Sequence, residues 1–308
     1  MTTSLPSAER LNAVPPSGIV VLDKPVGVTS QRAVTMVKRA LGVRKAGHAG
    51  TLDPMASGVL VVGLGRATKL LTYITGADKQ YEATIRLGQA TTTDDADGEP
   101  VGEVVDATGL AMDAIDAAMR HYVGGIDQVP SAVSAIKVNG QRAYALVRAG
   151  QDVTLAPRRV RVDRFDVLQR NDRVPFVDLD VVVDCSTGTY IRALARDLGR
   201  DLGVGGHLVA LRRPRVGGFS VGHAVSLDEL SWAAVTPAGE AARVVLPVVE
   251  VDDTAARDVS FGRALPFAVP AEATAVLGPD GDLLAVYRPA DPGRSVPAVV
   301  FVPPGVAQ

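Results

Sequence analysis

One aspartate stands alone in a basic part of the chain. Asp53 is the only acidic residue between Lys24 and Ala77, a stretch that carries eight lysines and arginines. If this surface meets a polyanion, the carboxylate opposes binding, and chemistry is the usual reason for keeping it. The surrounding positive charge should lower the pKa of Asp53 and hold it ionised as a nucleophile. The structural alternative is that Asp53 and Pro54 begin a helix or form a turn.

Two other features could carry chemistry but have simpler explanations. Cys185 is the single cysteine and could be a thiol nucleophile, yet a lone cysteine at a strand end is more often a small buried hydrophobic residue. The apolar run 59–64 leads into a glycine pattern that resembles the start of a dinucleotide or adenosylmethionine loop. Thr68 occupies the third glycine position, and Asp78 comes too early to contact a ribose. A strand followed by a turn explains this segment better.

The composition predicts a globular protein without a metal or disulfide framework. The chain has 308 residues, 47% hydrophobic and 21% charged, which suits about two domains. The four histidines lie far apart in the sequence, and none forms the spaced pair that binds zinc. The amino terminus lacks an apolar core of signal-peptide length, and the apolar stretch 58–64 is too short to span a membrane. We therefore expect a cytoplasmic protein.

Charge is distributed unevenly along the chain. From Val225 onward, eleven acidic residues face five arginines, a net charge of −6. Because the whole chain carries −2, residues 1–224 carry +4. A moderately basic body is compatible with a nucleic-acid partner.

Periodicity predicts strands with helices distributed among them. We expect helices at 30–41, 111–122 and 189–202, with Ser30 capping the first, and strands at 18–22, 79–88 and 176–185. No regular strand–helix alternation appears, so the pattern favours an α+β fold with a mixed or antiparallel sheet. After about residue 242, short strands separated by glycine and proline indicate a small β-rich module.

Arginines in the helix at 189–202 offer a partner for Asp53. Arg192, Arg196 and Arg200 recur every four residues and lie along one face. That face could be solvated and paired locally, or Arg192 could form a fork on a carboxylate or a phosphate. Basic clusters at 158–164 and 211–215 suit a phosphate backbone. Tyr81 lies on the apolar side of its strand, where ordinary core packing is the alternative to a site role.

Six motifs occur in a fixed order: D-K-P-x-G-x-T-S, G-H-A-G-T-L-D-P-x-A-x-G-V-L, K-x-Y-x-A-x-x-x-L-G, T-T-T-D-D-A-D-G, S-A-x-K-x-x-G-x-R-A-Y and C-S-x-G-T-Y-I-R. Together they resemble the TruB family, the bacterial tRNA pseudouridine(55) synthases, over about residues 18–220. The L-D-P and T-Y-I-R blocks are individually specific. The resemblance implies that Asp53 is the catalytic nucleophile, that Tyr81 stacks on the target base and that Arg192 pairs with the nucleophile.

The resemblance also implies contacts with the RNA. His48, Tyr190 and Leu211 match positions that contact the substrate nucleotide, Lys24 lies near the RNA, and Asp95 matches an aspartate near the site. This chain has Thr92 where many relatives carry another aspartate.

We expect four segments. Residues 1–17 are rich in serine, proline and small residues, which predicts a flexible tail. The resemblance implies a pseudouridine synthase catalytic domain at 18–242, a mobile RNA-clamping lobe at 129–153 within it, and a small PUA-like domain at 243–308. The −6 charge of the last argues against a strong grip on phosphates.

The implied reaction converts uridine-55 in the T-loop of tRNA to pseudouridine. The C1′–N1 bond breaks, the base rotates, and C5 joins C1′. Since nothing is oxidised and no outside group is transferred, we expect no cofactor; the partner is the tRNA T stem-loop, and the family favours a monomer. Asp53 could add covalently or remove a proton from C2′ to give a glycal. A non-catalytic tRNA-folding chaperone and a uridine C5-methyltransferase that uses Cys185 are competing functions.

Overall fold

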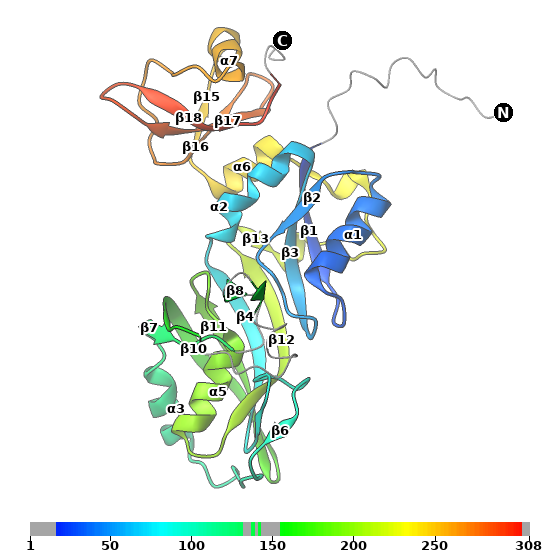
Figure 1. Cartoon of the computed structure of the whole chain (residues 1–308), viewed down its shortest axis with the longest axis vertical. Helices are drawn as coiled ribbons and strands as arrows, with labels where there is room; N and C mark the ends of the chain where they lie inside the picture. The colour runs from blue at the N-terminus through cyan, green and yellow to red at the C-terminus, as the bar shows by residue number, and fades with distance from the viewer. Residues whose placement is uncertain (1–16, 132–136, 139–140, 143–154, 304–308) are drawn as a thin grey trace, which may run out of the picture.

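The computed structural model describes residues 17–131, 137–138, 141–142 and 155–303. Its largest element is a ten-stranded sheet that runs through the middle of the molecule (Figure 1). Eight strands lie in the order β14 (Thr236–Pro237), β1 (Gly18–Lys24), β3 (Ala56–Leu64), β12 (Gly206–Val216), β4 (Lys79–Leu87), β11 (Phe176–Cys185), β10 (Arg158–Arg173) and β7 (Gly124–Gln128). β2 (Ala46–Ala49) pairs with β3, and β13 (Phe219–Ser220) pairs with β12. β3 and β12 are parallel, whereas the other strand pairs in this sheet are antiparallel, so the predicted mixed sheet is confirmed.

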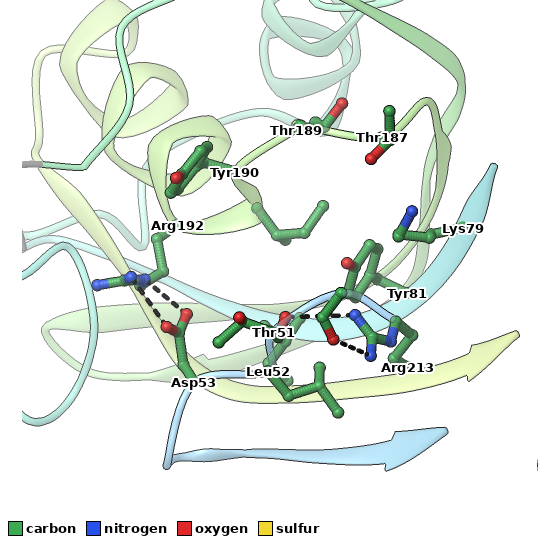
Figure 2. A pocket seen from close by; sticks show the side chains of 14 residues that line it. Thr51, Leu52, Asp53, Lys79, Tyr81, Thr187, Thr189, Tyr190, Arg192 and Arg213 are labelled. Carbon is green, nitrogen blue, oxygen red and sulfur yellow. Dashed lines mark hydrogen bonds and ion pairs between the residues drawn. The ribbon is translucent and has the colours of Figure 1, made fainter. Parts of the chain in front are cut away.

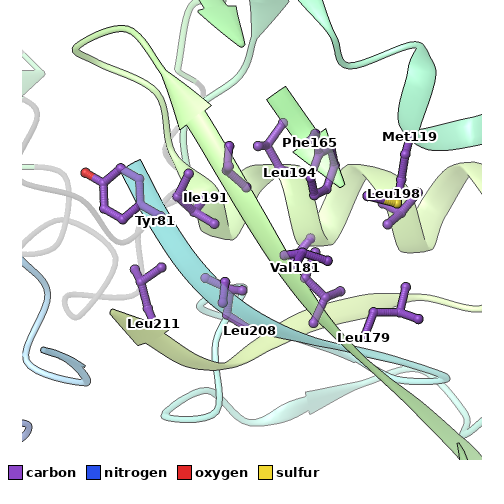
Figure 3. Close-up of a cluster of buried hydrophobic side chains, with 14 of the residues drawn as sticks. Tyr81, Met119, Phe165, Leu179, Val181, Ile191, Leu194, Leu198, Leu208 and Leu211 are labelled. Atoms are coloured by element: carbon purple, nitrogen blue, oxygen red, sulfur yellow. The ribbon is translucent and has the colours of Figure 1, made fainter. Parts of the chain in front are cut away.

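Helices cover the sheet where the apolar periodicity predicts them. α1 (Ser30–Ala40) packs Ala33, Val34 and Val37 against β1 and β3. α3 (Met112–Arg120) and α5 (Ile191–Asp201) pack on the other half of the sheet. Figure 3 shows Leu194 and Leu198 of α5 facing this core. Short segments complete the domain: α2 (Leu71–Thr75), η2 (Gly65–Lys69), η3 (Val221–His223), η4 (Trp232–Ala234), and the paired β5 (Ala90–Thr91) and β6 (Pro100–Val101).

The prediction that Ser30 caps α1 is wrong by one residue. Thr29 is the cap, because its side chain accepts a hydrogen bond from Arg32 N at 3.1 Å. The Ser30 hydroxyl is buried instead, donating to Leu52 O at 3.0 Å and accepting from Leu52 N at 2.9 Å. The start of α1 is thereby fastened to the segment that precedes Asp53.

The carboxy-terminal part forms a second, four-stranded sheet, as the β-rich pattern predicts. Its strands are β15 (Val248–Glu250), β16 (Thr274–Leu277), β17 (Leu283–Pro289) and β18 (Ser295–Val300), covered by α7 (Asp253–Ser260). α6 (Ala238–Val245) connects the two sheets, and its Ala241 and Ala242 pack in one hydrophobic cluster with residues of both. Arg66 Nη1 also donates to Phe301 O at 2.9 Å.

Two predicted segments lie wholly or largely outside the described residues. Of the tail at 1–17, the structure describes only Ser17, whose hydroxyl donates to Leu64 O at 3.1 Å. Of the lobe at 129–153, it describes 129–131 and the paired strands β8 (Lys137–Val138) and β9 (Gln141–Arg142). Across the described residues, no helix is long and apolar enough to cross a membrane.

The two halves of the large sheet meet where Gly58 of β3 lies against Arg213 of β12. Gly58 has a φ of 104°, and a Cβ there would lie 2.4 Å from Arg213 O. The parallel contact therefore needs a residue without a side chain.

We predict that Gly58→Ala lowers the free energy of unfolding by about 3 kcal/mol or more, because strain at positive φ adds to a backbone clash. Gly42→Ala is the matched control, since Gly42 also has a positive φ, 65°, but open space around it. It should cost about 1–2 kcal/mol. Urea titration of both variants measures the difference, and equal losses would refute the close-approach argument.

Candidate active site

A pocket opens where the two halves of the sheet meet, and most of the predicted site residues line it (Figure 2). The loop before β3 contributes residues 50–53, and the segment 187–190 contributes together with the first two residues of α5, Ile191 and Arg192. β4 supplies Lys79 and Tyr81, and β12 supplies Leu211 and Arg213. Residues distant in sequence are thus brought together by strand pairing.

Arg192 holds two carboxylates in one buried network. Its Nε lies 3.0 Å from Asp53 Oδ2 and its Nη2 lies 3.2 Å from Asp53 Oδ1. Its Nη1 lies 3.1 Å from Asp95 Oδ2. Arg192 and Asp95 are buried, whereas 35% of the Asp53 side chain is exposed. The fork fixes the orientation of the carboxylate and leaves one side of it facing the pocket.

The structure reverses the expected shift of the Asp53 pKa. Burial raises the pKa of the Asp53 carboxyl above its ordinary value, and the charge of Asp95 adds to the rise. Arg192 and then Lys24 oppose it. The sequence-based expectation considered only the basic surroundings and omitted the loss of hydration, which is the larger effect here. Of the structural alternative, the helix start is wrong and the turn is confirmed, because Ala56 N donates to Asp53 O at 3.1 Å and β3 follows.

Tyr81 and Leu211 combine core packing with a place in the pocket wall. They lie on adjacent strands, are 7% and 8% exposed, and belong to the largest hydrophobic cluster (Figure 3). Burial raises the pKa of Tyr81. Tyr190 also lines the pocket, and Gln128 holds its backbone with bonds of 2.8 and 3.0 Å. The packing and site interpretations of Tyr81 therefore do not exclude each other.

Lys24 and His48 lie beside the pocket and do not line it. Lys24 is fully buried and donates to Pro25 O at 2.8 Å and Val28 O at 2.7 Å. Burial lowers its pKa to about 8. This ammonium supports the loops under Asp53 and is shielded from solvent. His48 is half-buried on β2, where burial lowers its pKa.

The interpretation of Cys185 as a nucleophile is wrong, and the favoured interpretation as a buried hydrophobic residue is confirmed. Cys185 is 1% exposed, and burial raises its pKa to about 11, so the thiol is not ionised at neutral pH. A nucleophilic cysteine needs the opposite environment. Within the described residues, no group of three His, Cys, Asp or Glu side chains could hold a metal ion.

Sequence reasoning missed Lys79 and Arg213, which are 5% and 1% exposed and line the pocket. Arg213 donates to Val59 O at 2.9 Å and Gly50 O at 3.0 Å. Strand alternation could have found it, because Arg213 lies two residues after Leu211 and so points to the same side. The inward direction of Arg213 was overlooked because residues 211–215 were interpreted as a surface cluster that binds phosphate.

Neither basic cluster is a free phosphate-binding surface. Arg212 pairs with Asp23 at 2.8 Å, and Arg161 pairs with Asp78 at 2.9 Å. The remaining ion pairs join Arg161 to Asp163, Arg215 to Asp184, Arg159 to Asp127 and Arg164 to Asp166. By contrast, the cations of α1 and the turn after it have no ion pair with a described carboxylate: Arg32, Lys38, Arg39, Arg44 and Lys45. Four of these five are exposed, with Lys38 half-buried.

Comparison with known families agrees with this arrangement. Residues 38–191 match the amino-terminal domain of the TruB family pseudouridylate synthases. Residues 192–251 match the tRNA pseudouridylate synthase B C-terminal domain, and residues 246–302 match the tRNA pseudouridine synthase II C-terminal domain. The chain belongs to the TruB family.

Individual relatives extend this match over nearly the whole chain. A TruB family protein of Cutibacterium acnes, tRNA pseudouridine synthase B, is 55% identical over 279 residues, 89% of this chain and 94% of that protein. The protein of the same name from Arthrobacter sp. (strain FB24) is 50% identical and covers 93% of this chain and 97% of its own. A Cbf5-Nop10-Gar1 complex contains a chain with a TM-score of 0.71 and 28% identity, covering 94% of this chain and 86% of that one.

We predict that Asp95→Asn lowers the pKa of Asp53. The substitution removes a negative neighbour that raises this pKa, and that neighbour is also a carboxylate bonded to the same arginine as Asp53. Titration of 13C-labelled aspartates by NMR measures the shift. Asp94→Asn is the matched control, because Asp94 pairs with Arg196 at 3.1 Å and its charge is not among the causes that shift the Asp53 pKa. An unchanged or raised Asp53 pKa in Asp95→Asn would contradict the prediction.

Proposed function

We propose that this protein is a tRNA pseudouridine synthase that isomerises uridine-55 in the T-loop to pseudouridine. The supporting observation is Asp53, held by the Arg192 fork at the edge of a pocket walled by Tyr81 and Leu211. Its relatives named tRNA pseudouridine synthase B, at 50–55% identity, support the same substrate class. We also propose that it acts in the cytoplasm as a monomer, without cofactor or metal.

The pocket suits a nucleotide that has left the RNA stack. The Tyr81 ring offers a stacking face for uracil, and Leu211 on the adjacent strand fills apolar space beside it. In this scheme Tyr190, which lines the pocket just before α5, contacts the substrate nucleotide, and His48 on β2 is assigned a contact with the same nucleotide. The base can then rotate without re-entering the helix.

Asp53 acts on the sugar–base bond in this scheme. Either it adds covalently, or it removes a proton from C2′ and a glycal forms; in both routes the C1′–N1 bond pair leaves with uracil. In the covalent route, C5 joins C1′ as the bond between Asp53 and C1′ breaks. In the glycal route, C5 joins C1′ as Asp53 returns the proton to C2′. C5 then loses its proton and N1 gains one, so the atoms balance in both routes. Arg192 and Asp95 hold the carboxylate in line with the sugar throughout. Tyr81 is the candidate group for moving the C5 proton.

A tRNA-folding role is the second candidate, and the unpaired cations of α1 favour it. Arg32 and Arg39 lie seven residues apart and project from the outer face of the helix, opposite Ala33 and Val37. Exposed cations bind a phosphate backbone whatever residue stands at position 53. Binding and remodelling of tRNA would therefore survive the loss of catalysis.

Asp53→Asn separates the two roles. We predict that release of tritium from 5-tritiated uridine in tRNA falls at least about 1,000-fold, because the acting carboxylate is lost. The dissociation constant for tRNA should stay close to that of the wild type, since the outer cations are intact. Asp94→Asn is the control for a lost carboxylate near α5 and should keep most activity. Near wild-type tritium release by Asp53→Asn would reject Asp53 as the reacting group.

A further inference from the structure

The far side of the pocket from the Asp53–Arg192 pair carries two buried cations, Lys79 and Arg213. Both line the pocket, and neither forms an ion pair with a described carboxylate. Asp78, next to Lys79 in the sequence, is paired with Arg161 at 2.9 Å. Burying a cation without a counter-charge is costly, so this arrangement needs a reason.

The two cations meet at the backbone of Gly50. A Cβ at Gly50 would lie 3.5 Å from both Arg213 Nη1 and Lys79 Cε. Arg213 donates to Gly50 O in the loop and to Val59 O in β3, and its side chain also hydrogen-bonds Tyr81. Lys79 Nζ donates to Thr75 O at 3.1 Å and Ala77 O at 2.7 Å. Because an ammonium has three donors, one remains for the pocket.

The proposed reaction creates a negative charge in this pocket. When the C1′–N1 bond breaks, its electron pair stays on uracil and spreads from N1 to O2 and O4. Lys79 and Tyr81 are two residues apart on β4 and point to the same side of the strand. A uracil ring stacked on Tyr81 therefore has an edge near Lys79, and an ionic donor placed where charge develops lowers the barrier.

We propose that Lys79 is a further catalytic residue, which donates to the edge of the detached uracil anion, and that Arg213 is a positioning residue for the adjoining loop. The inference rests on the proposed function. It gives the pocket a sugar side, with Asp53 and Arg192, and a base side, with Lys79. No external group is required, because the ammonium stabilises the anion until C5 joins C1′ and a proton passes from C5 to N1.

A catalytic role for Lys79 predicts a reaction rate that depends on pH. Burial lowers its pKa to about 8, and Arg213 adds to the decrease, while Cys185 and Asp78 oppose it. The ammonium is charged below this pKa, so the rate should fall as pH rises through about 8. Lys24 also has a pKa near 8, so it could produce the same decline. Arginine substitutions distinguish them, since a guanidinium stays charged.

The test is the single-turnover rate of pseudouridine formation in tRNA from pH 6.5 to about 9.5, spanning both sides of the lysine pKa values. Lys79→Arg should abolish the decline near pH 8, whereas Lys24→Arg should retain it. Lys79→Met should lower the rate about 100-fold at neutral pH with unchanged tRNA affinity, the size of effect seen for the loss of one such donor.

The outcomes separate the two proposals. If the wild type forms no pseudouridine in tRNA, the proposed function fails. If the wild type is active but Lys79→Arg keeps the decline, or the decline disappears only in Lys24→Arg, the role of Lys79 is rejected. Should Lys79→Met fail to fold, the profile of the charge-conserving Lys79→Arg variant still decides. A structural lysine would alter melting temperature and tRNA affinity but leave the pH profile unchanged.

Discussion

The ion pair between Asp53 and Arg192 is the interaction on which the rest of the site depends. The partners are 139 residues apart and come from different halves of the large sheet. Asp53 precedes β3, and Arg192 lies in the first turn of α5, which packs on β4 and β12. The pair therefore forms only if β3 and β12 align, and the contact at Gly58 allows this alignment. The geometry of the Asp53 carboxylate therefore depends directly on correct pairing of β3 with β12.

Desolvation explains why so many supporting contacts surround this pair. A buried ion pair loses hydration, and its geometry must recover that cost through additional hydrogen bonds. Ser30 binds Leu52 before Asp53, Lys24 braces the neighbouring loop, and Asp95 takes the remaining side of Arg192. The same loss of hydration raises the pKa of Asp53, because burial disfavours the charged carboxylate. Loss of hydration thus accounts both for the raised pKa of Asp53 and for the contacts that support the ion pair.

The unpaired cations of the α1 region and the cations around the pocket differ in their exposure to solvent. Exposed cations on α1 and the turn after it face solvent, where they can meet a polyanion over a wide area. Buried cations at Lys24, Lys79, Arg192 and Arg213 surround the pocket, where water is scarce and each charge acts strongly at short range. Most arginines of the clusters at 158–164 and 211–215 belong to neither group, because they form ion pairs with nearby aspartates. Counting basic residues along the chain cannot separate these classes.

The sequence alone predicted the main element types and singled out Asp53 as the candidate nucleophile. Alternation in β4, the apolar stripe of α5 and the isolation of Asp53 are local patterns, so they could be recognised without a structure. The tertiary structure decided the direction of the Asp53 pKa, the inward turn of Arg213 and Lys79, and the pairing of the surface arginines. Each of these depends on burial and on partners far away in the chain, and a linear pattern contains neither quantity. The sequence specifies which side chains are ionisable, but their burial and partners, which set pKa values and ion pairing, arise only on folding.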